Sequence, residues 1–113
     1  MKEFMLIFIG GADPSALSPE DMQNQMMKWF AWVEKLKKEN IYSSGEALMP
    51  GGKHLKGAKH VITDGPFAES KEVVGGYFIV KANTLEEAIE IAKECPDLPY
   101  NSTIEVREVM KFN

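Results

Sequence analysis

The chain has 113 residues, of which 44% are apolar and 27% are charged, and its net charge at pH 7 is −4. This length fits a single domain over residues 1–113, and the composition is that of an ordinary globular protein. Its 13 lysines and arginines are scattered and form no stripe with interleaved aromatic residues. We therefore expect no nucleic acid partner, because binding to nucleic acid depends on a basic footprint.

The sequence predicts neither export nor a membrane anchor. The N-terminal apolar run covers only residues 4–9, and no run approaches the ~18 apolar residues of a membrane span. The lone cysteine, Cys95, has no partner for an internal disulfide, and we interpret it as a small buried apolar residue. The two histidines, His54 and His60, lack the spacing of metal ligands. These features predict a cytoplasmic protein without a metal or a cofactor.

The first strand and the first helix are marked by their apolar patterns. Residues 4–9 (FMLIFI) are apolar at every position, which predicts a strand that is buried on both faces. Ser18 is a helix N-cap residue, and Asn40 is a typical residue at which a helix stops. Between them, apolar residues recur at the spacing of one helix face: Met22, Met26, Trp29, Val33 and Leu36. We interpret this stripe as core packing rather than as a cofactor site.

Alternation and turn residues predict the remaining elements. Thr84 and Glu87 form a capping box, which begins a second helix that ends before Pro96. We expect a polar turn over 49–57 and further strands over 41–48, 58–64, 75–82 and 103–112, the last with Ile104, Val106, Met110 and Phe112 on one face.

The order of these elements, with one strand more between the two helices than the pattern contains, predicts an α+β fold of the ferredoxin-like β-α-β-β-α-β type. In this fold two helices cover one face of a four-stranded antiparallel sheet, and we expect strands 58–64 and 75–82 to pair around the loop between them. Strands 4–9 and 75–82 are apolar on both faces, so the second face of the sheet also needs a cover. A second copy of the chain would provide it, which predicts a homodimer that packs sheet against sheet.

Three segments resemble the DGPF branch of the YCII-related proteins: DGPFAESKE at 64–72, GGYFIVKANTLEEAIEIA at 75–92 and IEVREV at 104–109. The likeness extends from about Phe4 to Val109. It implies a ferredoxin-like domain that pairs into a dimeric α+β barrel. Relatives with this fold include small-molecule enzymes that move protons, such as lactone isomerases and dehydrochlorinases. Some DGPF proteins are linked to extracytoplasmic-function sigma factors.

The catalytic pair of the YCII-type enzymes is not carried over to this chain. Those enzymes use a His and an Asp, with the His expected on or beside the first helix, whereas no histidine occurs here before His54. We place His54 in the exposed polar turn and His60 on the third strand, on the same face as Asp64. The chain also has Glu108 where the family often has a proline, and YNSTI at 100–104 lacks the glycine that is usual there.

The loop that begins at Asp64 is the first candidate site. Gly65 permits unusual backbone angles and Pro66 fixes the next one, so this loop is held rather than loose. Asp64 is a candidate general base, and the alternative is an Asx-turn in which its carboxylate accepts backbone N–H bonds. We interpret Phe67 as a packing residue. A run of charged residues then forms either a solvated surface or the rim of a ligand site: Glu69, Lys71 and Glu72.

A second candidate set lies on the sheet. Glu105 and Arg107 share the strand face opposite to Ile104 and Val106, and this face points toward the expected dimer partner. Arg107 either holds a ligand carboxylate in a forked contact or forms a salt bridge that fixes the dimer. Tyr77 is a further candidate ligand contact.

We therefore expect a protein that binds a small polar or acidic molecule in a cleft at the dimer-facing side of the sheet. The reaction would be proton transfer, isomerisation or elimination, with Asp64 as the base. The ligand contacts would come from Gly65, Pro66, Phe67, Glu69, Lys71, Tyr77, Glu105 and Arg107. The alternatives are a non-catalytic regulatory or protein-interaction module that associates with a sigma factor, and a stable dimer in which the charged loop is architecture only.

Overall fold

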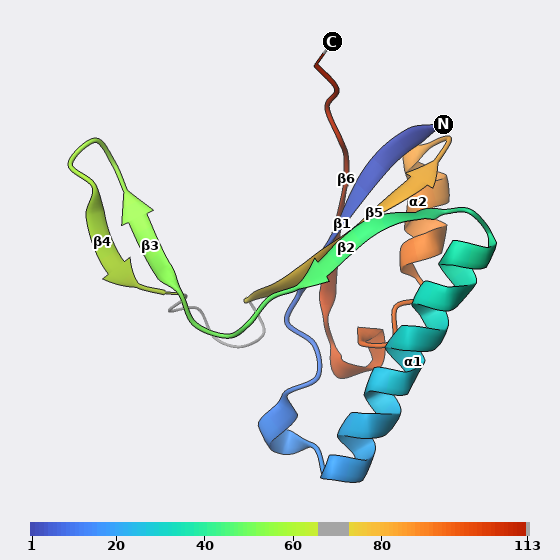
Figure 1. Cartoon of the computed structure of the whole chain (residues 1–113), viewed down its shortest axis with the longest axis horizontal. Helices are drawn as coiled ribbons and strands as arrows, with labels where there is room; N and C mark the ends of the chain where they lie inside the picture. Colours follow the sequence, from blue (N-terminus) through green and yellow to red (C-terminus); the bar gives the residue numbers. More distant parts are fainter. Residues whose placement is uncertain (66–72, 113) are drawn as a thin grey trace.

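The computed structural model describes residues 1–65 and 73–112, which form an α+β domain (Figure 1). Its α-helices are α1, Pro19–Lys38, and α2, Leu85–Ala92. Its strands are β1, Lys2–Ile9, β2, Tyr42–Ala47, β3, Lys53–Lys56, β4, Val61–Asp64, β5, Val74–Ala82, and β6, Thr103–Glu108. Short 3-10 turns cover Pro14–Ala16 (η1) and Leu98–Tyr100 (η3).

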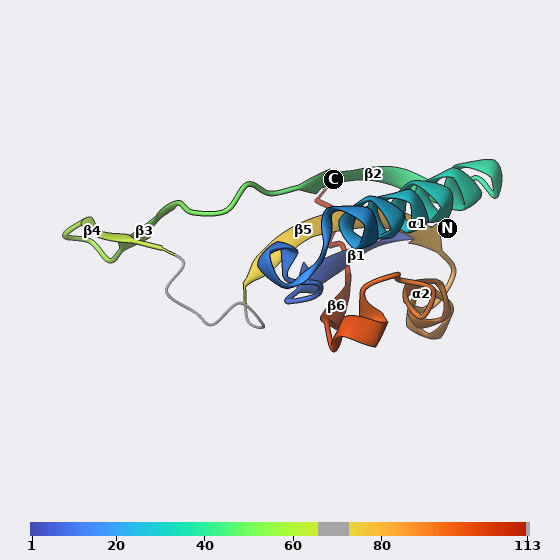
Figure 2. The same cartoon turned by 90° about the horizontal axis from the view of Figure 1, so that it is seen from below.

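The main sheet is antiparallel and has the strand order β2-β5-β1-β6. Together with α1 and α2, these strands form the β-α-β-β-α-β unit of the ferredoxin-like fold, so the predicted α+β class is confirmed. Both helices cover the same face of the sheet, and the other face is open (Figures 1 and 2). The pairing of two copies into a barrel stays a prediction.

The core lies between the helices and the sheet. Along β1 the side chains of Phe4, Leu6 and Phe8 are buried, whereas the residues between them are half-buried on the opposite face. Val80 is fully buried on the neighbouring β5, and Leu36 of α1 is 1% exposed. Apolar residues therefore alternate between a closed and an open face of the sheet. β1 is apolar on both faces, and the part of the chain that the structure describes covers one of them.

α1 begins and ends as the sequence predicts. The Ser18 hydroxyl accepts a hydrogen bond from the N–H of Asp21 at 3.1 Å, and Asn40 adopts a φ of 61° just after the helix. Leu36 of the predicted stripe is buried, and Trp29 and Val33 pack against the core, but Met26 departs from the prediction. Trp32 is 5% exposed, whereas Met26 is 51% exposed, because the indole of Trp32 fills the space against the sheet and leaves Met26 at the helix surface.

The segment between β2 and β5 differs from the prediction. β3 and β4 pair with each other in a hairpin of residues 53–64, which we call the arm. The predicted pairing of β4 with β5 around the loop is wrong, because β5 pairs with β1 and β2 instead. Gly57, with a φ of 75°, and His60, with a φ of 55°, form the tight turn that allows this local pairing. His60 therefore lies in a turn and shares no strand face with Asp64.

The last strand is shorter than predicted. β6 ends at Glu108, so Met110 and Phe112 are 73% and 88% exposed instead of lying on the inner face of a strand. Among the described residues β6 pairs with β1, and Glu108 lies opposite Phe4. In this register Met110 falls opposite Lys2, where β1 begins, and Phe112 falls beyond β1.

Cys95 gives the folded state a pH dependence that can be measured. Its side chain is 4% exposed, and burial raises the pKa of the thiol from 9.0 to about 11. The folded protein keeps this thiol protonated at a pH where the unfolded chain ionises, so the contribution of Cys95 to stability is full below pH 9 and is lost as the pH rises toward 11. We expect chemical denaturation to show a steeper loss of stability over this pH range in the wild type than in Cys95→Ala. Parallel pH curves for the two proteins would contradict this account.

Candidate functional site

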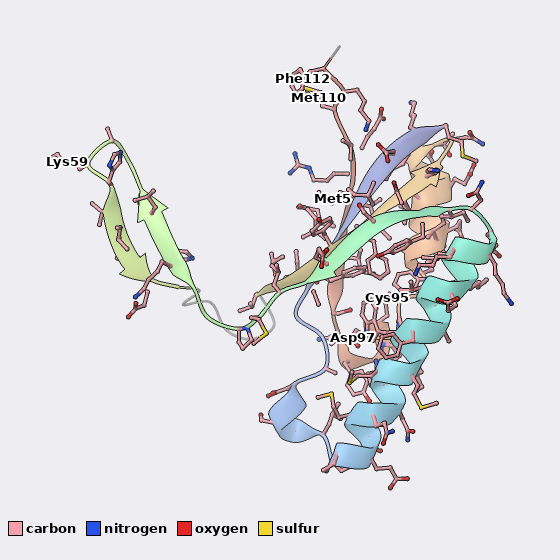
Figure 3. All side chains as sticks on the ribbon, viewed as in Figure 1. Met5, Lys59, Cys95, Asp97, Met110 and Phe112 are labelled. Atoms are coloured by element: carbon pink, nitrogen blue, oxygen red, sulfur yellow. The ribbon has the colours of Figure 1, made fainter. Side chains whose placement is uncertain are left out.

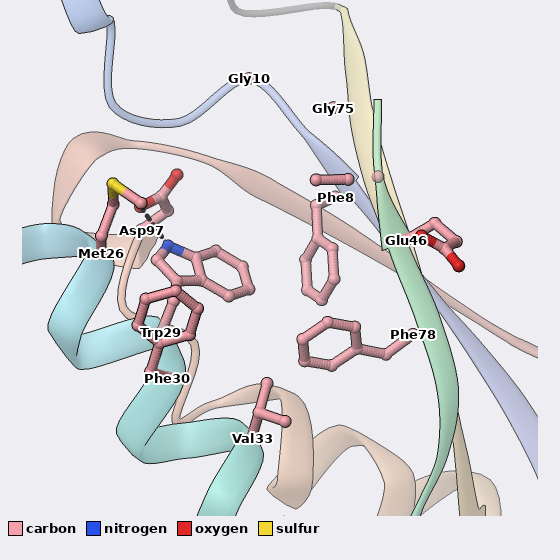
Figure 4. Close-up of a pocket in the computed structure, with 12 residues that line it drawn as sticks. Phe8, Gly10, Met26, Trp29, Phe30, Val33, Glu46, Gly75, Phe78 and Asp97 are labelled. Atoms are coloured by element: carbon pink, nitrogen blue, oxygen red, sulfur yellow. Dashed lines mark hydrogen bonds between the residues drawn. The ribbon is translucent and has the colours of Figure 1, made fainter. Parts of the chain in front are cut away.

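A pocket opens between α1 and the β2–β5 edge of the sheet (Figure 4). Its volume is about 380 Å³, within the range of about 300–1,000 Å³ that is usual for small-molecule sites. The lining comes from both layers of the domain and includes Phe8, Met26, Trp29, Val33, Phe78 and Asp97. A ligand-sized space therefore lies on the helix-covered side of the sheet.

Aromatic rings form the walls of this pocket. Phe8 and Phe78 extend from the sheet, and Trp29 faces them from α1 (Figure 4). The ring centroids of Phe8 and Trp29 are 5.0 Å apart and those of Phe8 and Phe78 are 4.9 Å apart, with an angle of 86° between the ring planes in each pair. Edge-to-face pairs of this kind are mutually stabilising. The walls are therefore held in position by one another, without a ligand.

Glycines allow the two strands at the pocket to come close together. A Cβ atom at Gly76 would lie 2.5 Å from the carbonyl oxygen of Glu46, and a Cβ atom at Gly45 would lie 2.5 Å from the ring of Phe78. Any larger residue would push β2 and β5 apart or displace the ring. At Gly75, which also lines the pocket, an added Cβ atom would meet nothing within 4 Å.

Asp97 is the polar centre of the site. One oxygen of its carboxylate, Oδ1, accepts hydrogen bonds from Nε2 of Gln25 at 2.7 Å and from Nε1 of Trp29 at 3.0 Å. The other oxygen, Oδ2, accepts a bond from the backbone N–H of Ala12 at 3.2 Å. Gln25 Nε2 also donates to the carbonyl of Pro96 at 2.9 Å. Asp97 thus joins α1, the segment after β1 and the start of η3, and it fixes the orientation of the Trp29 indole.

The charge in the pocket is negative. Glu46 contributes to the lining, but its side chain points away from the cavity (Figure 4). The carboxylate of Asp97 is therefore the ionised group that a ligand would meet among the described lining residues. A carboxylate accepts hydrogen bonds and cannot donate them, and it repels other anions. This pocket suits a ring with an O–H or N–H group better than an acid.

Asp64 lies at the end of β4, on the arm. Its carboxylate pairs with Lys53 of β3, and its side chain is 74% exposed. The ring of His54 lies against the next residue, since a Cβ atom at Gly65 would be 2.6 Å from it. His54 is exposed as predicted, but it lies on β3 rather than in a turn. The roles of Asp64 as a base and of Gly65 as a ligand contact stay predictions.

Other residues of the predicted loop cannot be placed against the pocket. The predicted ligand contacts Pro66, Phe67, Glu69 and Lys71 lie outside the described residues.

The predicted contacts on the sheet lie on its open face. Ile7 of β1 pairs with Tyr77 on one side and with Glu105 on the other, and Met5 pairs with Arg107. Tyr77 is half-buried, and Glu105 and Arg107 are exposed. The structure therefore brings these three residues together on the face that lies opposite to the helices, where Glu105 and Arg107 were expected. Their contact with a ligand stays a prediction.

The contacts around Asp97 do not follow from the sequence pattern. A signal was present in Gln25, which lies three residues after Met22 and four before Trp29 on a helix face that is otherwise apolar. A buried polar side chain needs a hydrogen-bond partner, and Gln25 is 4% exposed. The sequence did not indicate which residue would be that partner.

Two features are absent from the described residues. Over 1–65 and 73–112, no group of three or more His, Cys, Asp and Glu side chains is arranged to hold a metal ion. Within the same ranges, no helix combines the length and the apolar character that crossing a membrane requires.

The fold and the pocket define a small ferredoxin-like domain with an aromatic, ligand-sized cavity. Comparison with known families then identifies it further. Residues 4–113 match the model of the YCII-related domain, so the chain belongs to the YCII-related family.

Two similar proteins share limited sequence with this chain. A curated relative, "Uncharacterized protein R00369" of Rhizobium meliloti (strain 1021), is 35% identical over 53 residues, which cover 46% of this chain and 43% of the relative. The match thus spans less than half of that protein. A solved structure, 5-chloro-2-hydroxyhydroquinone dehydrochlorinase from Burkholderia phenoliruptrix AC1100 in complex with 2,5-dihydroxybenzoquinone, aligns over 96% of this chain and 95% of its own. Its sequence identity is 17% and its TM-score is 0.43.

The two aspartates should differ in their effect on stability. Asp97→Ala leaves the donors of Gln25 and Trp29 without their acceptor, and we expect it to lower the free energy of unfolding by about 2–4 kcal/mol. Asp97→Asn keeps an acceptor oxygen and should therefore lower the free energy of unfolding by less than Asp97→Ala does. Asp64→Ala removes an exposed ion pair and should change stability by less than about 1 kcal/mol. Urea denaturation measures all three, and an Asp97→Ala protein as stable as the wild type would refute the role of this carboxylate.

Proposed function

We propose that this YCII-related protein binds a small ring compound that carries a hydroxyl or amino group, in the pocket between α1 and the sheet. The observation that carries this proposal is the combination of aromatic walls with a single inward carboxylate among the described lining residues. A flat ligand can pack against the faces and edges of the rings of Phe8, Trp29 and Phe78. Asp97 would accept the hydrogen bond from its polar group.

Proton transfer, isomerisation and elimination all need a base next to the ligand. Asp97 lines the pocket, whereas Asp64 lies on the arm. We therefore propose Asp97 as the carboxylate that would accept a proton from a ligand in this pocket. The binding of the ring comes first in this proposal, and it is tested first.

We also propose that two copies of the chain pair through their open sheet faces. Half-buried apolar side chains, among them Met5, Ile7 and Ile79, occupy the centre of that face. A patch of this kind on a single chain favours a partner, and a second copy with two-fold symmetry is the simplest one. The alternative, a regulatory module that associates with a sigma factor, stays a prediction.

A matched pair of ligands tests the proposed site. 2-Naphthol and 2-naphthoate share the same ring system, but one carries a hydroxyl group and the other a carboxylate. We expect 2-naphthol to raise the melting temperature and to bind about tenfold or more tightly than 2-naphthoate in calorimetric titrations, because Asp97 accepts from the former and repels the latter.

Two substitutions on α1 locate the binding. Val33 lines the pocket, whereas Met27 is 60% exposed and does not belong to the lining. Val33→Trp should fill the cavity and weaken 2-naphthol binding about tenfold or more, since a bulky ring then competes for the same space. Met27→Trp adds the same ring elsewhere on the helix and should leave binding unchanged. Equal affinity in both variants, or stronger binding of 2-naphthoate, would contradict the proposal.

A further inference from the structure

The arm, residues 53–64, is poorly buried by its own chain. It extends away from the domain as a two-stranded hairpin (Figure 1). Leu55 and Ile62 face each other across the hairpin, and each is 66% exposed, while Val61 is 54% exposed. An isolated hairpin is marginally stable in water and needs a surface to pack against. The apolar residues of the arm indicate that such a surface comes from another molecule.

The arm extends on the same side of the domain as the open sheet face. The helices lie on one side of the sheet, and the arm projects away from them on the other (Figure 1). Met5 marks the open face and Lys59 marks the tip of the arm (Figure 3). A molecule that covers the open face therefore comes to lie beside the arm. The two exposed apolar surfaces thus fit one and the same partner.

The charges of the arm point to the chemistry of this partner. Residues 53–64 contain three lysines and one aspartate, whereas the whole chain has a net charge of −4, so the remainder of the chain is acidic. Exposed carboxylates lie on both edge strands of the sheet, Glu46 on β2 and Glu105 on β6. A basic arm and an acidic domain attract each other between two copies of this chain.

We propose that the arm packs on the domain of a second copy of the chain. In a two-fold dimer, each copy would cover the open sheet face of the other. Each arm would pack against the side of the partner's domain. Leu55 and Ile62 would be buried in this contact, and Lys56 and Lys59 would lie near carboxylates of the partner. The inference extends the proposed homodimer from the sheet to the arm, and it is independent of the pocket.

Sedimentation equilibrium on the full chain tests this contact. We expect the wild type to be a dimer at micromolar concentration, and we expect the double variant Leu55→Asp/Ile62→Asp to raise the dimer dissociation constant about 30-fold or more. Both positions are exposed in the single chain, so the variant should keep the circular dichroism spectrum of the wild type. Met27→Asp, an equally polar change at an exposed site of α1, should leave the dissociation constant unchanged.

Cross-linking identifies the contact directly. Isotope-labelled and unlabelled chains are mixed, treated with a carbodiimide that joins lysines to carboxylates, and digested for mass spectrometry. We expect mixed-isotope cross-links from Lys56 or Lys59. A monomeric wild type would overturn the arm contact together with the sheet dimer. A dimer that keeps its affinity in the double variant, with no mixed cross-link from the arm, would overturn the arm contact and leave the sheet dimer standing.

Discussion

The carboxylate of Asp97 holds together the three segments that build the pocket. Its bonds to Gln25 and Trp29 fix α1, and its bond to Ala12 fixes the chain where it leaves β1. A half-buried carboxylate is stable there because its hydrogen bonds replace those that it would make with water. Those bonds also place the Trp29 indole opposite the rings of the sheet. The same group therefore supports the fold, orients the wall of the cavity and gives the cavity its negative charge.

The sheet has two apolar faces, of which the helices cover one. Phe4, Leu6 and Phe8 alternate along β1 with half-buried residues on the open side, so one strand serves both the closed core and the uncovered face. The helices cover the first face incompletely, and the pocket is the space that remains beside α1. The second face and the arm have no cover among the described residues 1–65 and 73–112. Ligand binding and self-association would therefore use opposite sides of the same sheet.

Local chemistry made much of the fold predictable. Helix capping at Ser18 and Thr84 and the apolar alternation along the strands depend only on residues that are close in sequence. The helices and the sheet form where these local patterns predict them. The arm was not predictable in the same way, because β4 had two possible partners and periodicity does not choose between them. The burial of Trp32 and the exposure of Met26 depend on how α1 packs against the sheet. The site depends on Asp97 and Gln25, which are 72 residues apart in sequence. Asp64 carried the stronger sequence signal, but it lies on the arm and outside the described lining of the pocket.

The most direct test of this account is the signal of the Trp29 indole N–H in nuclear magnetic resonance spectra of the isotope-labelled protein during a titration with 2-naphthol. This proton lies in the hydrogen bond to Asp97 at the wall of the pocket. The account expects a saturable shift of this signal, while the amide of Lys59 at the tip of the arm stays in place. Saturable shifts confined to Met5 and Ile7 on the open face, with the Trp29 signal unmoved, would contradict the account.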